Sequence, residues 1–256
     1  MRGGRVRTGD VVDPRPVVRV DALPGLRAAE VDGEEGDPGG WPYSIPAVAD
    51  LMRDGLDLDD VTILVGENGS GKSTIVEAVA MAYGLNAEGG STGARNSTWA
   101  SESPLHRSLR LVRGGGASKW GYFLRAETMH GLFSYLQASG PERDFHSRSH
   151  GEAFWEMVTT SRFDGRGFFV FDEPEAGLSF DAQLRLLAML HEVAGRRGAQ
   201  VLLATHSPVL AALPGATIHE LSDAGLRRAR WDELAMVDHH RRFLAAPERY
   251  LDQLLD

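Results

Sequence analysis

The feature that most constrains this chain is a glycine-rich octapeptide that follows a short apolar run. Residues 61–65 are continuously β-prone and apolar, as expected of a strand covered on both faces. The octapeptide 66–73 then matches G-x-x-x-x-G-K-[ST] at every fixed position, and a helical pattern follows over Lys72–Tyr83 and stops at Gly84. Because a strand before and a helix after are the context this motif requires, we expect a phosphate-binding loop and not a chance glycine-rich turn.

Each residue type in this loop has a physical reason. Glycines let the backbone approach phosphate closely with its N–H groups pointing inward, and the following helix N-terminus adds a positive dipole end. Lys72 is expected to reach the β- and γ-phosphates, and the Ser73 hydroxyl to take a position on Mg²⁺. The implied ligands are therefore ATP and Mg²⁺. The nucleotide-binding candidates are Gly66, Glu67, Asn68, Gly69, Ser70, Gly71, Lys72, Ser73 and Thr74.

Two further segments end apolar strands on polar residues. The run 168–171 delivers Asp172 and Glu173, of which Asp172 is suited to hold Mg²⁺ and Glu173 to polarise the attacking water as general base. An acidic pair at such a place is otherwise a strand-end cap. The run 201–204 leads to His206, which is placed to sense the γ-phosphate or, alternatively, to cap a helix or lie satisfied in the core. The catalytic candidates are thus Glu173, His206 and Lys72.

The order of elements predicts the fold class. Buried strands at 61–65, 168–171 and 201–204 alternate with helices at 72–83, 179–194 and from Ser207-Pro208 onward. A short strand is expected at 17–20, another at 109–112, a hairpin around 222–225, and two polar helices at the end. We therefore expect an α/β fold with a mainly parallel sheet flanked by helices and a small antiparallel β portion. Residues 1–15 are interpreted as a flexible leader and 16–256 as one domain.

Composition excludes several classes of protein. The chain has 0 Cys, so it forms no disulfide and no thiolate metal site, which fits a reducing cytosol. The formal net charge is −9, whereas strong nucleic-acid binders carry a broad positive surface. A nucleic-acid partner is therefore possible, but the charge does not support it. No apolar run approaches the ~20 residues that span a bilayer. We expect a cytoplasmic protein.

Three motifs together resemble the ABC ATPase superfamily. They are the loop 66–74 running into Glu77-Ala78-Val79, the tetrapeptide 149–152 (Ser-His-Gly-Glu) at the place of the ABC signature, and the segment 172–179 (Asp-Glu-Pro-Glu-Ala-Gly-Leu-Ser). Their details are similar to SMC/RecF-type ATPases and to small stand-alone bacterial AAA-family ATPases, more than to transporter subunits. The resemblance covers about residues 41–221. The 99 residues from Ser73 to Asp172 lack heptads, so a long coiled-coil arm has no room.

The resemblance implies further roles. Ser149 and Gly151 would contact the γ-phosphate of ATP bound to the other subunit of a head-to-tail homodimer, although 149–152 also fits a capping box. The signature is not Leu-Ser-Gly-Gly-Gln, and Glu127 stands where the family has its loop glutamine. Trp41 or Tyr43 would stack on adenine, or both belong to the core.

Three functions remain open at the level of sequence. The first is an ATPase whose ATP-driven dimerisation is a conformational switch, with DNA repair or phage defence suggested by family analogy alone. The second is the nucleotide-binding subunit of an ABC transporter, and the third is a nucleotide-gated binding module with negligible turnover. One basic cluster, Arg227-Arg228 with Arg230, is either a DNA contact or a solvated polar face, and His239-His240 is expected to be a solvated pair.

Overall fold

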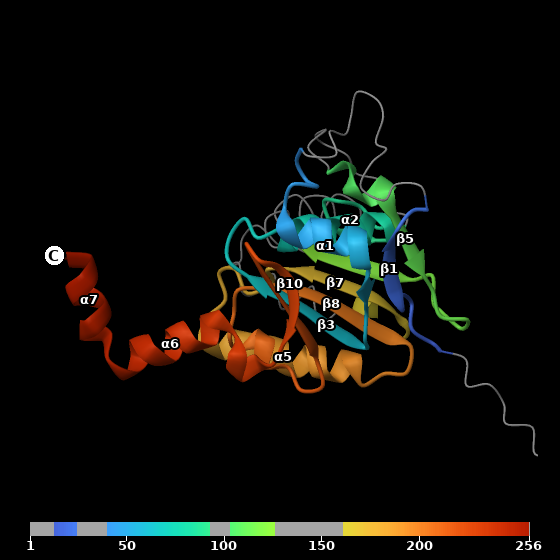
Figure 1. Cartoon of the computed structure of the whole chain (residues 1–256). Helices are drawn as coiled ribbons and strands as arrows, with labels where there is room; N and C mark the ends of the chain where they lie inside the picture. The colour runs from blue at the N-terminus through green and yellow to red at the C-terminus, as the bar shows by residue number, and fades with distance from the viewer. Residues whose placement is uncertain (1–12, 25–39, 93–102, 126–160, 256) are drawn as a thin grey trace, which may run out of the picture.

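The computed structural model describes residues 13–24, 40–92, 103–125 and 161–255. Its centre is a seven-stranded sheet in the order β10-β9-β3-β8-β7-β6-β4 (Figure 1). The five strands from β9 to β6 in this order are parallel, and the edge strands β10 and β4 are antiparallel to their neighbours. The expected mainly parallel sheet is confirmed. The strands are β3 (Val61–Gly66), β4 (Gly90–Ser91), β6 (Gly121–Arg125), β7 (Gly167–Asp172), β8 (Ala199–Thr205), β9 (Thr217–Ser222) and β10 (Gly225–Ala229).

Helices cover both faces of this sheet. One face packs against α1 (Pro46–Asp54) and α2 (Lys72–Tyr83), and the other against α5 (Phe180–Ala194), as Figure 1 shows. The strands β7 and β8 are buried at every position because both of their faces are covered. The phenylalanines of β7 alternate accordingly, with Phe168 in the α2 layer and Phe169 and Phe171 in the α5 layer. Apolar burial on two faces fixes the register of the strands that carry the site.

A small antiparallel sheet lies over the α2 layer. It has the order β2-β1-β5, formed by β1 (Arg19–Ala22), β2 (Leu56–Asp57) and β5 (Leu109–Val112). The expected antiparallel portion is therefore confirmed, and so is the strand at 109–112, whereas the N-terminal strand begins two residues later than the 17–20 pattern indicated. Arg15, which we assigned to the leader, donates to the Leu58 carbonyl at 2.8 Å, so ordered contacts with the body already exist before residue 16.

One helix prediction is wrong in extent. The segment after Ser207-Pro208 forms a short 3-10 turn, Leu210–Ala212, in place of a full helix. Ser207 Oγ accepts hydrogen bonds from the backbone N–H groups of Val209 and Leu210, so the turn is capped, but Pro214-Gly215 follows too soon for an α-helix to develop. The chain then enters β9. The remaining 3-10 turns are Pro104–Ser108, Ser161–Phe163 and Trp231–Glu233.

The expected hairpin and terminal helices are present. β9 and β10 pair as an antiparallel hairpin, followed by α6 (Ala235–Ala245) and α7 (Pro247–Leu255), which extend away from the body in Figure 1. Within the described residues, no helix has the length and apolar content needed to cross a bilayer.

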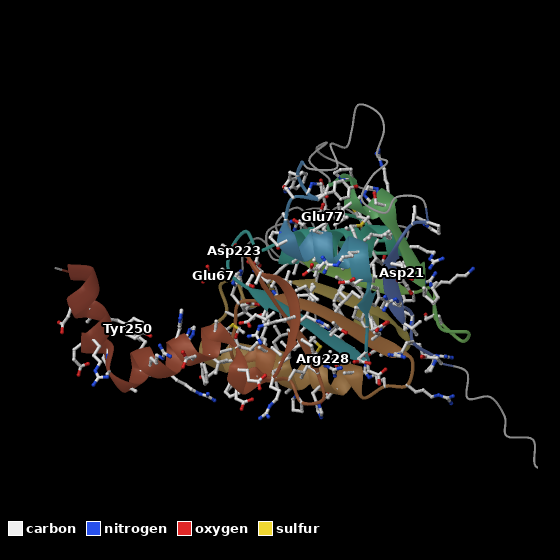
Figure 2. All side chains as sticks on the ribbon, in the orientation of Figure 1. Asp21, Glu67, Glu77, Asp223, Arg228 and Tyr250 are labelled. Carbon is white, nitrogen blue, oxygen red and sulfur yellow. The ribbon has the colours of Figure 1, made fainter. Side chains whose placement is uncertain are left out.

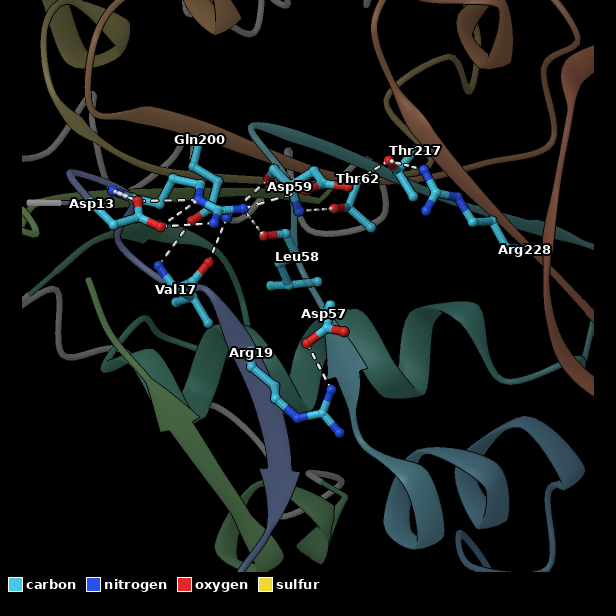
Figure 3. Close-up of polar contacts among 11 residues, drawn as sticks. Asp13, Val17, Arg19, Asp57, Leu58, Asp59, Thr62, Gln200, Thr217 and Arg228 are labelled. Atoms are coloured by element: carbon cyan, nitrogen blue, oxygen red, sulfur yellow. Dashed lines mark hydrogen bonds and ion pairs between the residues drawn. The ribbon is translucent and has the colours of Figure 1, made fainter. Parts of the chain in front are cut away.

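A polar cluster joins the elements at the edge of the sheet where the parallel strands begin (Figure 3). Gln200, which is completely buried, accepts from Val17 N at 2.9 Å and donates to the carbonyls of Val17 and Asp59 at 2.5 and 3.0 Å. The Asp59 carboxylate accepts from Thr217 Oγ1 at 2.6 Å, and the Asp59 N–H donates to Thr62 Oγ1. These bonds connect the N-terminal segment with β3, β8 and β9.

Candidate functional site

The strand-to-helix loop 66–71 opens the site. Gly69 and Gly71 have φ of 80° and 97°, which side-chain-bearing residues rarely adopt, and a Cβ on Gly71 would lie 2.7 Å from Ile45 Cγ2. The glycines at these positions are therefore required by conformation. Ser70 Oγ is buried without a hydrogen-bond partner among the described residues. An unpaired hydroxyl and a loop of exposed backbone N–H groups are donors that an anion such as phosphate would accept.

Lys72 begins α2 and lies across this loop. Its side chain is 3% exposed, and Nζ donates to the carbonyl oxygens of Gly66 and Glu67, each at 3.0 Å. Burial lowers the pKa of Lys72, and the nearby carboxylates of Glu173, Asp172 and Glu175 partly offset this. A buried ammonium whose hydrogen bonds go to two backbone carbonyls is available to an incoming polyphosphate, whose charged oxygens are stronger acceptors.

Ser73 and Asp172 meet although they lie 99 positions apart in the sequence. Ser73 Oγ donates to Asp172 Oδ1 at 2.9 Å, because β7 ends beside the first turn of α2. Asp172 is 4% exposed. A hydroxyl and a carboxylate are hard oxygen donors of the kind that bind Mg²⁺ together with phosphate and water. No group of three or more His, Cys, Asp or Glu that could hold a metal occurs within the described residues.

Glu173 and His206 form a second pair at the ends of β7 and β8. His206 Nε2 lies 2.8 Å from Glu173 Oε1, and both side chains are about one third exposed, at 32% and 35%. Glu173 has φ of 48°, the only positive φ of a non-glycine residue within the described ranges. Such a conformation is strained and occurs disproportionately at functional sites.

Glu175 is a member of the site that sequence reasoning missed. Its Oε1 accepts from Thr205 Oγ1 and from the His206 backbone N–H, both at 2.6 Å. Its Oε2 is buried without a hydrogen-bond partner among the described residues. Glu175 therefore fixes the backbone from which His206 projects. The available signal was the position of Glu175, which lies two residues after Glu173 in the segment 172–179 that the sequence analysis had already singled out.

Arg125 was also missed as a site residue, and Glu77 was noted only as part of the motif 66–79. Arg125 is the last residue of β6 and is paired in register with Asp172. Its Nη1 lies 2.6 Å from Glu77 Oε2 on α2, and its Nε lies 3.3 Å from Asp172 Oδ2. The signal was its position after an apolar strand, the same signal that identified Asp172.

A cavity of about 770 Å³ adjoins the outer side of the loop. Its wall consists of residues 65–70, the hairpin segment 220–224 and the start of α6, together with His206 and Arg227. Figure 2 shows Glu67 and Asp223 at this end of the sheet. His239 and His240, which we expected to be a solvated pair, also line this cavity.

The basic cluster of the hairpin is paired with protein groups. Arg227 forms an ion pair with Glu220, Arg228 donates to Thr217 Oγ1 at 3.3 Å, and Arg230 pairs with Asp232 at 3.0 Å. Figure 2 places Arg228 far from Asp223 along the sheet. Each of the three arginines therefore has a polar partner within the protein.

Several predicted residues lie outside the described part of the chain, namely Ser149, Gly151 and Glu127. The two aromatic candidates differ from each other. Tyr43 packs against the core of the α2 layer and its hydroxyl lies 2.7 Å from Ser108 Oγ, whereas Trp41 is 59% exposed.

Comparisons with known proteins agree with this geometry. Residues 56–116 match a family model described as an AAA domain, and residues 153–212 match one described as "AAA domain, putative AbiEii toxin, Type IV TA system". The chain is 26% identical over 207 residues to the zinc import ATP-binding protein ZnuC of Vibrio cholerae. The matched region covers 78% of this chain and 71% of ZnuC. In its motifs and fold the chain is similar to ABC-type P-loop ATPases.

Solved structures similar to this chain include the SMC head domain from Thermotoga maritima, with TM-score 0.38, 15% identity, and coverage of 69% of this chain and 93% of that one. Another is cbiO1 from Clostridium perfringens, described as part of an ABC transporter complex, with TM-score 0.44, 13% identity, and coverage of 80% and 92%.

Proposed function

We propose that this chain is an ABC-type ATPase that binds ATP with magnesium, hydrolyses it, and uses the bound nucleotide to join two copies head to tail. The observation that carries the proposal is the convergence at one sheet edge of Lys72, the Ser73–Asp172 pair and the Glu173–His206 pair. In open α/β sheets, ligands bind outside the carboxyl ends of the parallel strands, which is where these groups lie.

Each group has a role that its surroundings support. Lys72 binds the β- and γ-phosphates, and Ser70 and the loop N–H groups of the cradle, residues 66–74, are further donors to these phosphates. Ser73 and Asp172 hold magnesium, which when bound neutralises charge on the phosphates. Glu173 accepts a proton from the attacking water, and His206, held by Glu175, keeps that carboxylate oriented. Exposed Trp41 is the candidate for stacking on adenine.

Dimerisation is supported by an apolar surface next to the site. Phe180 and Leu184, in the first two turns of α5, are 63% and 44% exposed directly after the segment 172–179. Large exposed apolar side chains beside a polar site are typical of interaction surfaces. On this proposal, Ser149 and Gly151 of one copy contact the nucleotide held by the other.

Two measurements test the proposal. Isothermal calorimetry with Mg-ATP is expected to show binding by the parent chain and none by Lys72→Ala, because the ammonium is the main cation reaching the phosphates. Light scattering of Glu173→Gln with Mg-ATP is expected to show a dimer, and Phe180→Asp in the same background a monomer that still binds ATP. A monomer in the Glu173→Gln protein would rule out the switch while leaving ATP binding intact.

The second candidate is the nucleotide-binding subunit of a transporter, which the similarity to ZnuC favours. It requires an integral membrane partner. Affinity purification of the Glu173→Gln protein from detergent-solubilised cells of the source, followed by mass spectrometry, distinguishes the two. Stoichiometric recovery of a membrane protein would favour the transporter subunit, and recovery of the chain with itself alone would favour the switch.

A further inference from the structure

The ion pair at the end of β6 connects three elements around Asp172. Arg125 and Asp172 are directly opposite each other in the β6–β7 register, so both side chains leave the sheet on the α2 side. On that side Glu77 of α2, labelled in Figure 2, contacts the guanidinium. The strand register and the α2 layer thus determine this contact, independently of any loop.

All three side chains are largely removed from water. Arg125 is 18% exposed, Glu77 11% and Asp172 4%. At this depth a carboxylate is costly unless a cation or hydrogen-bond donors accompany it. Asp172 has both, because Oδ1 accepts from Ser73 and Oδ2 faces Arg125 Nε at 3.3 Å.

The consequence concerns the order in which the site is loaded. A divalent cation that arrived alone would have to approach a carboxylate already neutralised by Arg125, with the positive charge of Lys72 also held nearby by the loop carbonyls. A cation that arrives on a polyphosphate brings its own negative charge, which compensates both Arg125 and Lys72.

We propose that Arg125 is a positioning residue that holds Asp172 against Ser73 and prevents the site from taking magnesium without nucleotide. Glu77 anchors the guanidinium from the opposite side, so that Arg125 stays in place when Asp172 turns toward the metal. The inference rests on the proposed function for its biological use. Measuring Mn²⁺ binding needs no ATP and no turnover, so its outcome does not depend on whether the proposed function is correct.

The test measures Mn²⁺ binding to the full chain by electron paramagnetic resonance in the absence of nucleotide. Arg125→Met removes the charge and keeps an apolar stem. Mn²⁺ is therefore expected to bind at least about tenfold more tightly than in the parent, because one neighbouring charge shifts a carboxylate's affinity for a proton by about this factor. Arg125→Lys retains the charge and is expected to bind Mn²⁺ as weakly as the parent. Arg110→Met, which removes an arginine paired with Asp21 in the small sheet, is the matched control and is expected to change nothing.

A second readout separates positioning from folding. In Arg125→Met the Mg²⁺ concentration that half-saturates ATP hydrolysis is expected to fall, while the affinity for metal-free ATP stays the same. A purely structural role would instead weaken the binding of both Mg²⁺ and ATP and lower the thermal stability. Arg125→Gln is the second variant if the methionine variant does not fold. Equal Mn²⁺ affinity in the parent and in the neutral variant overturns the proposal, and so does failure of both neutral variants to fold, which would make the ion pair a folding element.

Discussion

The central sheet has one edge where its parallel strands begin and one where they end, and the two edges use polar residues in opposite ways. At the edge where the parallel strands begin, Gln200 satisfies three backbone groups and Asp59 is hydrogen-bonded on both sides (Figure 3). At the edge where they end, Ser70 Oγ and Glu175 Oε2 are buried without hydrogen-bond partners among the described residues, and Glu173 is strained. Buried polar groups in stable structure are normally satisfied, so unsatisfied and strained groups indicate where a ligand completes the structure.

The comparison predicts that changes at the two edges affect different quantities. At the strand-end edge they alter binding and turnover more than folding. At the strand-start edge they alter folding more than binding. Four predictions follow from this, and any one of them can break the comparison.

The largest effect is expected from Glu173→Gln. The amide keeps the shape of the side chain but cannot accept a proton, so kcat for ATP hydrolysis should fall by roughly 10²–10⁴-fold, the usual contribution of a general base. The measurement is phosphate release at saturating Mg-ATP, with Glu192→Gln on the exposed face of α5 as the matched control. Turnover that survives in Glu173→Gln would mean that another group activates the water. An equal loss in the control would show that the assay responds to charge and not to the site.

Gln200→Ala is expected to show the opposite pattern. It leaves the backbone groups of Val17 and Asp59 buried without partners, so the free energy of unfolding should fall by about 2–4 kcal/mol. Urea denaturation measures the loss, and calorimetry should give an unchanged Kd for Mg-ATP in the folded protein. A weakened Kd with unchanged stability would reverse the roles of the two edges.

The sequence could predict local features of the structure but not contacts between distant segments. The strand–loop–helix unit 61–83, the strands around 168–171 and 201–204, and the Ser179 N-cap of α5 depend on short-range patterns, and all are confirmed. The Ser207-Pro208 prediction failed because a helix start was visible, whereas the early stop at Pro214 was overlooked.

Contacts between distant segments were beyond the reach of the sequence. Arg125 faces Asp172 because β6 pairs with β7 in one particular register, and a shift by one residue would place the arginine in the α5 layer. Glu175 reaches Thr205 because β7 and β8 end at the same level. No pattern within one segment encodes either relation, whereas the roles of Lys72 and Ser73 follow from one contiguous motif.

Glu173→Gly tests the strain itself. Glycine adopts positive φ without penalty, so relief of the strained backbone should stabilise the fold by about 1 kcal/mol, even though one side chain is lost and glycine has more freedom in the unfolded chain. The measurement is the thermal midpoint, compared with Glu175→Gly, which has no positive φ to relieve and should be destabilised. A lower midpoint in Glu173→Gly would show that the Glu173–His206 contact contributes more than the strain costs.

The smallest effect is expected from His219 of β9, which lies between the two edges. Both of its ring nitrogens are buried without hydrogen-bond partners among the described residues, and burial, reinforced by Arg228, lowers its pKa below the ordinary 6.5, although Asp59 and Asp57 oppose this. Because the unfolded chain takes up the proton first, His219 stabilises the fold above pH 6.5 and this contribution is lost as the pH falls below it. The free energy of unfolding should therefore decrease from pH 7 to 5.5 more steeply in the parent than in His219→Gln, with His240→Gln on α6 following the parent. Parallel pH profiles for the parent and His219→Gln would mean that the charged ring finds a hydrogen-bond acceptor. The region of satisfied polar groups at the strand-start edge would then extend further along β9 than the contacts indicate.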